Sequence, residues 1–163
     1  MAYPHCTLLL THNPCRIDSS TAKVDSLSIQ ERPCFLCPSN RSAEQQSISW
    51  NNYNILINPF PIFRRHFTIV DKHHQAQRLS PERIGEMLVL ARNLPEYTIF
   101  YNGPGCGASA PDHFHFQAGN RGYMPIEKET KTENNPFFAG FKKLGRTMSP
   151  ARKEVGFPAI FCK

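Results

Sequence analysis

The sequence predicts an α+β fold in which one helix packs on an antiparallel β-sheet. Two strand-like segments, residues 53–58 and 67–70, follow each other closely and precede a helix-like pattern. Two more, residues 98–102 and 113–118, come after it and flank a glycine-rich loop. Strands joined by short connections pair antiparallel, and a single helix among them covers one face of the sheet.

The first two strands are predicted from apolar and β-branched residues bounded by prolines. Residues 53–58 contain Tyr, Ile and Leu, and Pro59 stops this strand. Pro61 keeps the following link extended. Residues 67–70 read Phe-Thr-Ile-Val, which is typical of a second strand.

A helix is predicted to begin after Ser80 and to end before Pro95. Ser80 suits the N-cap, Pro81 the first helical position and Glu82 the first turn. Four apolar residues with the spacing i, i+3, i+4 and i+7 are expected to form the buried face of this helix: Ile84, Met87, Leu88 and Ala91.

The last predicted strand contains the polar side chains that are candidates for a functional site. Residues 113–118 alternate strictly, so the side chains of His113, His115 and Gln117 are expected to share one face of the strand. The aromatic residues between them anchor the other face in the core. A row of three polar groups contributes little to stability, and it favours a polar ligand. The alternative is a half-exposed strand that carries two histidines without a ligand.

The preceding loop indicates which ligand this is. Residues 102–109 read Asn-Gly-Pro-Gly-Cys-Gly-Ala-Ser, so backbone N–H groups stand unobstructed beside the hydroxyl of Ser109. Phosphate oxygens bind such concave arrays of donors. The loop and the histidine strand together predict a nucleotide-phosphate site.

His115 is the predicted nucleophile of this site because it is central in the row. A neutral imidazole attacks phosphorus readily and can form a covalent nucleotidyl-histidine, provided that its second nitrogen is held by an acceptor. Gln117 is expected to donate a hydrogen bond to a phosphate oxygen or to the bridging oxygen of the leaving group. The catalytic residues predicted are therefore His115 and Gln117.

A Cys-x-x-Cys pair, Cys34 and Cys37, can hold Zn²⁺ if two further ligands join it. The candidates are His73, His74 and His113. A redox pair and two buried structural cysteines are the alternatives. With six cysteines and no recognisable signal peptide, we expect free thiols or metal ligands and a cytoplasmic protein.

Charge is distributed unevenly along the chain. Of the net charge of +6, residues 128–163 supply +5, from eight Lys or Arg and three Glu. We therefore expect residues 1–127 to form the nucleotide-binding domain, and residues 128–163 to be a basic tail that is poorly ordered or the remnant of a second half. Neither a nucleic acid nor a membrane is an expected partner, although a nucleic-acid-binding tail is an alternative.

The motif Asn102-Gly, Gly107-Ala-Ser109 and His113-x-His115-x-Gln117 resembles the histidine-triad superfamily, in the branch where glutamine replaces the third histidine. This branch contains galactose-1-phosphate uridylyltransferases, diadenosine tetraphosphate phosphorylases and GDP-L-galactose phosphorylases. The resemblance spans residues 13–127, and it is strongest to an uncharacterised bacterial family common in Bacteroides-type genomes. Its other motifs are Asn13-Pro-x-Arg16, Arg32-Pro-Cys-Phe-Leu-Cys37 and Asn58-Pro-Phe-Pro-Ile62.

The resemblance implies a histidine-triad-like sheet that forms one half of a two-half transferase architecture, and a homodimer could supply the missing half. It makes His115 the nucleophile. It also implies two sets of ligands. Around the phosphates are Asn102, Gly103, Gly107, Ser109 and Gln117, and around a structural zinc are Cys34, Cys37, His74 and His113.

The implied activity is that of a nucleotidyltransferase or phosphorylase. Its substrate is a nucleoside diphosphate sugar or a dinucleoside polyphosphate, and the reaction passes through a nucleotidyl-histidine. Two alternatives remain at this point, a dinucleoside polyphosphate hydrolase and a truncated, non-catalytic nucleotide-binding module.

Overall fold

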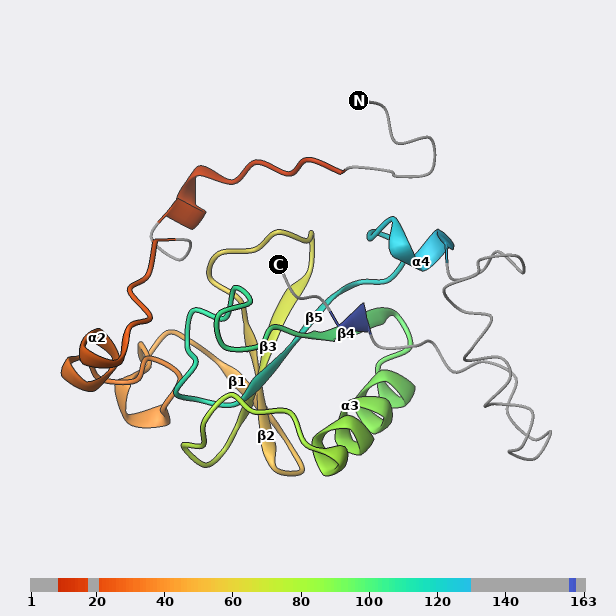
Figure 1. Cartoon of the computed structure of the whole chain (residues 1–163). Helices are drawn as coiled ribbons and strands as arrows, with labels where there is room; N and C mark the ends of the chain where they lie inside the picture. Colours follow the sequence, from red (N-terminus) through yellow and green to blue (C-terminus); the bar gives the residue numbers. More distant parts are fainter. Residues whose placement is uncertain (1–8, 18–20, 130–158, 161–163) are drawn as a thin grey trace.

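The computed structural model describes residues 9–17, 21–129 and 159–160 of the chain (Figure 1). The secondary-structure elements follow in this order: η1 Pro14–Arg16, α2 Ser26–Glu31, η2 Pro38–Asn40, β1 Ser47–Trp50, β2 Tyr53–Ile57, β3 His66–Asp71, α3 Pro81–Asn93, β4 Tyr97–Tyr101, β5 His115–Asn120, α4 Ile126–Glu129 and β6 Ala159–Ile160.

The strands form one sheet in the order β1-β2-β3-β5-β4-β6. Every pair from β1 to β4 is antiparallel, and the short β6 runs parallel to β4. The predicted α+β class, an antiparallel sheet with a packed helix, is therefore confirmed. Because β5 inserts between β3 and β4, the last strand of the predicted site lies inside the sheet with a neighbour on each side.

The four strands predicted from the sequence correspond to β2, β3, β4 and β5, whereas β1 was not predicted. Its sequence, Ser-Ile-Ser-Trp, is short and mostly exposed, so it lacks a recognisable apolar face. A turn at Asn51, whose φ is +46°, joins β1 to β2. Asparagine is one of the few residues that adopt this left-handed conformation readily.

The strand register divides the sheet into two faces. On one face, α3 covers a core of nine buried residues (Figure 1): Tyr53, Ile69, Met87, Leu90, Ile99, Tyr101, Phe114, Phe116 and Ala118. On the other face, Gln117 stands between Thr68 of β3 and Phe100 of β4, and His115 pairs with Val70. The predicted separation of Phe116 and Ala118 from His115 and Gln117 is therefore observed.

The limits of α3 agree with the prediction, but its buried face is only partly as predicted. The hydroxyl of Ser80 accepts a hydrogen bond from the backbone N of Arg83, as expected for the N-cap. Met87 and Leu90 are fully buried, whereas Ile84 and Leu88 are 39% and 38% exposed. The helix is rotated relative to the prediction, because the side of α3 that carries Arg83 faces the sheet. There the guanidinium of Arg83 lies 4.2 Å from the centroid of the Phe114 ring.

The fourth strand begins two residues later than predicted, at His115. His113 lies before the strand, in a bend where its backbone N donates to the carbonyl of Ala110 at 3.3 Å. The predicted start of this strand at His113 is therefore wrong by two residues. The bend directs His113 towards a different set of side chains, described below.

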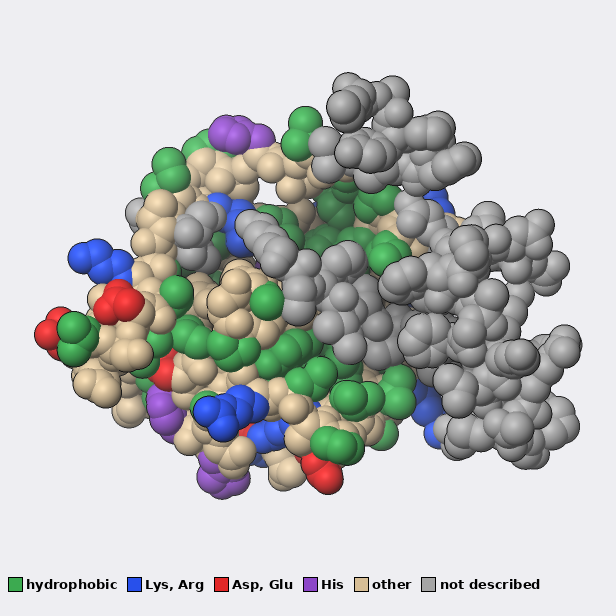
Figure 2. Space-filling view, in the orientation of Figure 1, with side chains coloured by type: hydrophobic (Ala, Val, Ile, Leu, Met, Phe, Trp, Pro, Cys, Tyr) green, Lys and Arg blue, Asp and Glu red, His purple; other side chains and the backbone are tan. Residues whose placement is uncertain are grey.

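Most of the predicted tail, residues 128–163, lies outside the described residues, so its division from residues 1–127 stays a prediction. None of the helices in the described part of the chain has the length and apolar character that a membrane crossing requires. On the face seen in Figure 2, the Lys and Arg side chains of the described residues lie in several separate places.

Gly119 is the one position of β5 where a side chain has no room. A Cβ placed there would lie 2.6 Å from the ring of Phe63. We predict that Gly119→Ala lowers the free energy of unfolding by ~1–3 kcal/mol, because the buried ring has to move. Gly85→Ala is the matched control, since a Cβ in the middle of α3 would meet no atom within 4 Å. It should raise the free energy of unfolding by roughly 0.5–1 kcal/mol. Urea denaturation measures both, and equal effects of the same sign would contradict the prediction.

Candidate functional site

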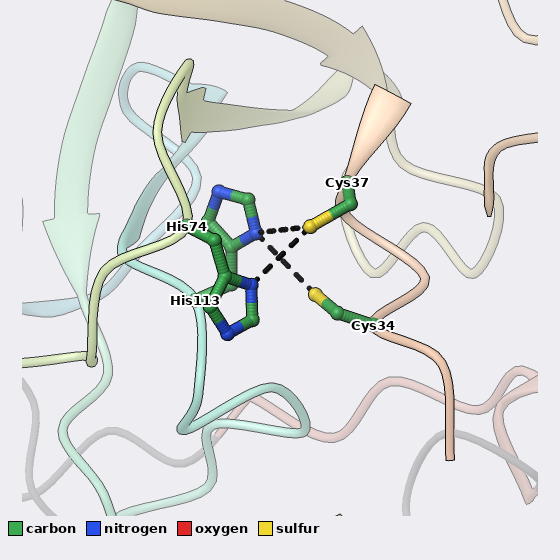
Figure 3. Close-up of side chains that lie close together, drawn as sticks. All are labelled: Cys34, Cys37, His74 and His113. Carbon is green, nitrogen blue, oxygen red and sulfur yellow. Dashed lines mark hydrogen bonds between the residues drawn. The ribbon is translucent and has the colours of Figure 1, made fainter. Parts of the chain in front are cut away.

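Two cysteines and two histidines meet at one end of the sheet (Figure 3). The four potential ligand atoms of Cys34, Cys37, His74 and His113 all lie within 4.8 Å of one another. Nδ1 of His113 is 3.3 Å from the Sγ atom of Cys34 and 3.5 Å from that of Cys37. Nδ1 of His74 is 3.2 Å from the Sγ atom of Cys37. These are the four residues that the family resemblance implied as metal ligands.

The cysteine pair is shaped by the residues that follow it. The backbone N of Cys37 donates to the carbonyl of Cys34 at 3.1 Å, which closes a tight turn. The side-chain amide of Asn40 donates to the same carbonyl at 2.9 Å, and Nε of Arg41 donates to the carbonyl of Leu36 at 2.8 Å. Both thiols are thereby presented on one side of the turn.

His113 is oriented by the backbone of β3. Its Nε2 lies 2.9 Å from the carbonyl oxygen of Asp71. A carbonyl can only accept, so Nε2 carries the proton and Nδ1 turns its lone pair towards the thiols. This tautomer is the one that a metal-binding histidine needs.

Asp71 also fixes the chain that leads to His74. Its Oδ1 accepts a hydrogen bond from the backbone N of His73 at 2.8 Å, which bends the chain after β3. Its Oδ2 forms an ion pair with Arg83 of α3. One buried carboxylate therefore connects the helix, the central sheet and the histidine end of the cluster.

The donor set fits a tetrahedral metal ion. Bond lengths of about 2.3 Å to sulfur and 2.0 Å to nitrogen place neighbouring ligand atoms about 3.5 Å apart, close to the sulfur–nitrogen distances given above. Burial raises the pKa of the Cys34 thiol to about 12, so a thiolate at this position requires a cation beside it. His73, the other histidine considered, is 76% exposed and turns its ring towards Asp71.

The ring of His115 is buried and held in one tautomer. Its Nδ1 lies 2.9 Å from the carbonyl oxygen of His113, so this nitrogen is the donor and Nε2 keeps its lone pair. Burial lowers the pKa of His115, and the hydrogen bond to the carbonyl of His113 opposes this effect only in part. The side chain is therefore a neutral imidazole with a free Nε2.

Gln117 is oriented by His66 of β3. The backbone N of Ile62 donates to Nδ1 of His66 at 3.3 Å, so the proton of this ring is on Nε2. Nε2 lies 2.8 Å from Oε1 of Gln117 and donates to it. The amide of Gln117 is thus turned so that its NH₂ group is the end left to face a ligand. Sequence analysis did not connect these two side chains.

The glycine-rich loop leaves β4 as a tight turn. Gly105 and Gly107 have φ angles of +72° and +92°, which residues other than glycine rarely adopt. The backbone N of Cys106 donates to the carbonyl of Gly103 at 3.0 Å. A Cβ added at Gly105 or Gly107 would meet no atom within 4 Å, so both backbones face open space among the described residues.

The two ends of this loop are held by other parts of the chain. The carbonyl of Asn102 accepts a hydrogen bond from the amide of Gln77 at 3.0 Å. Arg32 contacts the carbonyl of Ser109 at 3.5 Å and forms an ion pair with Asp112 at 2.8 Å. Sequence analysis missed these contacts. Nothing in the sequence around Gln77, Arg32 or Asp112 indicates a partner so far along the chain.

The structure therefore combines two features. A cysteine-histidine cluster lies at the end of the sheet, and beside it a central strand carries a buried histidine, His115, that is held in one tautomer. The chain belongs to the domain family of unknown function DUF4922, whose sequence profile matches residues 1–120. A comparison with curated proteins found no match.

Two solved structures are similar to the chain. The first, yeast Ap4A phosphorylase Apa2, is 21% identical with a TM-score of 0.47, over 66% of this chain and 41% of that one. The second, the same phosphorylase in complex with AMP, is 23% identical with a TM-score of 0.41, over 54% of this chain and 32% of that one. The chain thus spans less than half the length of these yeast structures.

The titration of His66 tests the arrangement around Gln117. Burial lowers the pKa of His66 to about 4. The unfolded chain takes up a proton on this residue near pH 6.5 and the folded chain does not, so stability falls as the pH is lowered. We predict that His66 titrates near pH 4 by NMR, and that it accounts for about 3 kcal/mol of stability lost between pH 6.5 and 4. His66→Asn should remove this part of the pH dependence. A His66 ring that titrates at or above pH 6.5 would contradict the prediction.

Proposed function

We propose that the chain transfers a nucleoside monophosphoryl group through His115, as a nucleotidyltransferase or phosphorylase. The observation that carries the proposal is the hydrogen bond from Nδ1 of His115 to the carbonyl of His113, which leaves Nε2 as the attacking atom. The resemblance of residues 102–117 to the glutamine branch of the histidine-triad superfamily supports the same role.

The proposed reaction has two in-line displacements at one phosphorus atom. In the first, Nε2 of His115 forms a bond to the α-phosphorus of a nucleoside diphosphate sugar or dinucleoside polyphosphate, and the bond to the bridging oxygen breaks. The leaving sugar phosphate or nucleotide departs with the electron pair of that bond. In the second, an oxygen of phosphate or of a sugar phosphate displaces the imidazole, which regains its lone pair.

The groups around His115 are suited to the charge on the phosphoryl oxygens. The NH₂ group of Gln117 is turned away from His66 and can donate to one of these oxygens. The backbone of residues 102–109 offers further N–H donors, and Gly105 and Gly107 keep them unobstructed. Donors that are fixed before the reaction stabilise the transition state without rearrangement. In this proposal Asn102, Gly103, Gly107 and Ser109 bind phosphate and Gln117 assists catalysis.

We infer that the metal of the cysteine-histidine cluster is zinc and that its role is structural. Two thiolates and two imidazoles are a preferred ligand set of Zn²⁺, and four protein ligands leave no position for a reacting water. The ligand His113 also supplies the carbonyl that holds His115. The ion would thus fix the position of the residue that orients the nucleophile.

The first test is intact-protein mass spectrometry after incubation with GDP-, UDP- and ADP-sugars and with dinucleoside polyphosphates. We predict a mass gain of one nucleoside monophosphate in the wild-type chain and none in His115→Ala. His73→Ala is the control, because His73 is exposed and outside the cluster. An adduct that persists in His115→Ala would refute the assignment of the nucleophile.

Product analysis with and without phosphate then distinguishes the proposed transfer from hydrolysis. Products that require phosphate or a sugar phosphate support transfer, and products that form equally well in its absence support a hydrolase. Nucleotide affinity without an adduct or turnover would identify a binding module and refute the proposal.

The metal is tested by elemental analysis of freshly purified protein. We predict about one zinc ion per chain, and loss of it in Cys34→Ser and in Cys37→Ser, because a tetrahedral site with three ligands binds zinc much more weakly. Cys15→Ser is the matched control, since Cys15 is exposed and lies outside the cluster. Protein that contains no metal, or a double variant of Cys34 and Cys37 that retains it, would overturn the prediction.

A further inference from the structure

Gln77 is a fully buried polar side chain that lies between β3 and α3, in a segment with no regular secondary structure. Its Oε1 accepts a hydrogen bond from the backbone N of His115 at 2.7 Å. Its Nε2 donates to the carbonyl of His115 at 2.9 Å and to the carbonyl of Asn102 at 3.0 Å. Both hydrogens of the amide NH₂ group are thereby used, and all three partners are backbone groups.

These partners are related by the register of the sheet. The β4–β5 ladder ends at the pair of Phe100 with Gln117. Continued for two more residues, the same register would place Asn102 opposite His115. At this point the strands are instead bridged by the side chain of Gln77. Its amide offers a carbonyl and an N–H group, as the peptide group of a neighbouring strand would.

The insertion explains how β4 can leave the sheet at this point. Where two strands separate, their buried N–H and C=O groups lose their partners, which costs free energy unless other groups replace them. Gln77 provides partners for both backbone groups of His115 and for the carbonyl of Asn102. The glycine-rich loop can therefore begin beside the histidine without leaving these groups unpaired.

Gln77 is itself held firmly in place. Its backbone N donates to the carbonyl of Pro111 at 3.0 Å, and its carbonyl accepts from the hydroxyl of Tyr101 at 3.0 Å. The main chain of Gln77 thus contacts the end of β4 and the segment before β5, while its side chain connects the first residue of the loop with His115.

We propose that Gln77 is a positioning residue that sets the spacing between the nucleophile His115 and the phosphate-binding loop that begins at Asn102. The proposal deepens the proposed function and rests on it for the role of His115. Gln77 touches no reacting atom. It acts by fixing two backbone segments whose separation decides whether Nε2 of His115 and the loop amides can reach the same phosphoryl group.

The amide of glutamine is the group that this position needs. A carboxylate in its place would only accept, and it would turn an oxygen towards the carbonyls of His115 and Asn102. An apolar side chain of similar size would leave three backbone groups, two of them on the buried His115, without this partner. Asparagine keeps the amide but is one methylene shorter, so it cannot maintain all three hydrogen bonds.

The experiment compares the wild-type chain with Gln77→Met and Gln77→Asn. The first readout is the rate of nucleotidyl adduct formation with diadenosine tetraphosphate, followed by intact-protein mass spectrometry. We expect a fall of about tenfold or more in Gln77→Met and a smaller fall in Gln77→Asn, because a displacement of the reacting groups by a fraction of an ångström slows such a step strongly. The zinc content should be the same in all three proteins.

The second readout needs no nucleotide. Hydrogen exchange of the His115 backbone amide, followed by NMR, reports directly on the hydrogen bond to Oε1 of Gln77. We expect exchange of this amide to become about tenfold faster or more in Gln77→Met. If wild-type protein forms no adduct with any donor, the proposed function fails, and the exchange measurement still decides whether Gln77 holds His115.

Two control variants separate positioning from general loss of stability. Gln46→Met makes the same chemical change at an exposed position outside the site and should leave the rate and the exchange within about twofold of wild type. Leu90→Ala is expected to lower the unfolding temperature by a different route, because Leu90 belongs to the core between α3 and the sheet. If Gln77→Met does not fold, Gln77→Asn decides the question. Wild-type rate and exchange in a folded Gln77 variant would overturn the proposal. The proposal would also be overturned if Leu90→Ala and a Gln77 variant had the same unfolding temperature and lost the same fraction of the rate.

Discussion

The hydrogen bond from Nδ1 of His115 to the carbonyl of His113 is the interaction on which the rest of the site depends. It selects the tautomer of His115. The carbonyl that accepts it belongs to His113, whose ring is turned towards the thiols of Cys34 and Cys37. The ring of His113 is held in turn by the carbonyl of Asp71, and the carboxylate of Asp71 is held by Arg83 of α3. The helix, the sheet, the cysteine-histidine cluster and the proposed nucleophile are therefore joined by one short chain of contacts.

Features that depend on local pattern could be predicted from the sequence. The alternation of residues 113–118 identified the buried face of β5, and Ser80 with Pro81 identified the start of α3. The spacing of Cys34 and Cys37 indicated a metal site, but from spacing alone the two histidines stayed open. The family resemblance supplied His74 and His113, and the structure brings all four side chains together.

Features that depend on contacts distant in the sequence could not be predicted. The buried face of α3 is set by the ion pair of Arg83 with Asp71, which no helical periodicity contains. The bend before β5 places His113 among the cysteines because backbone groups of β3 and of the preceding turn hold it there. Gln77 follows β3 in an irregular segment, where nothing in the sequence distinguishes it from a surface residue.

The separation of the four proposed metal ligands along the chain has a consequence for folding. Cys34 and His113 are 79 residues apart, and between them lie β1, β2, β3, α3 and β4. An ion bound by Cys34 and Cys37 alone would have only half of its ligands. The complete cluster can assemble only after the bend before β5 has reached β3, so capture of the proposed metal would belong to a late stage of folding. During synthesis, the ribosome would have to release residue 113 before the chain could close around the ion.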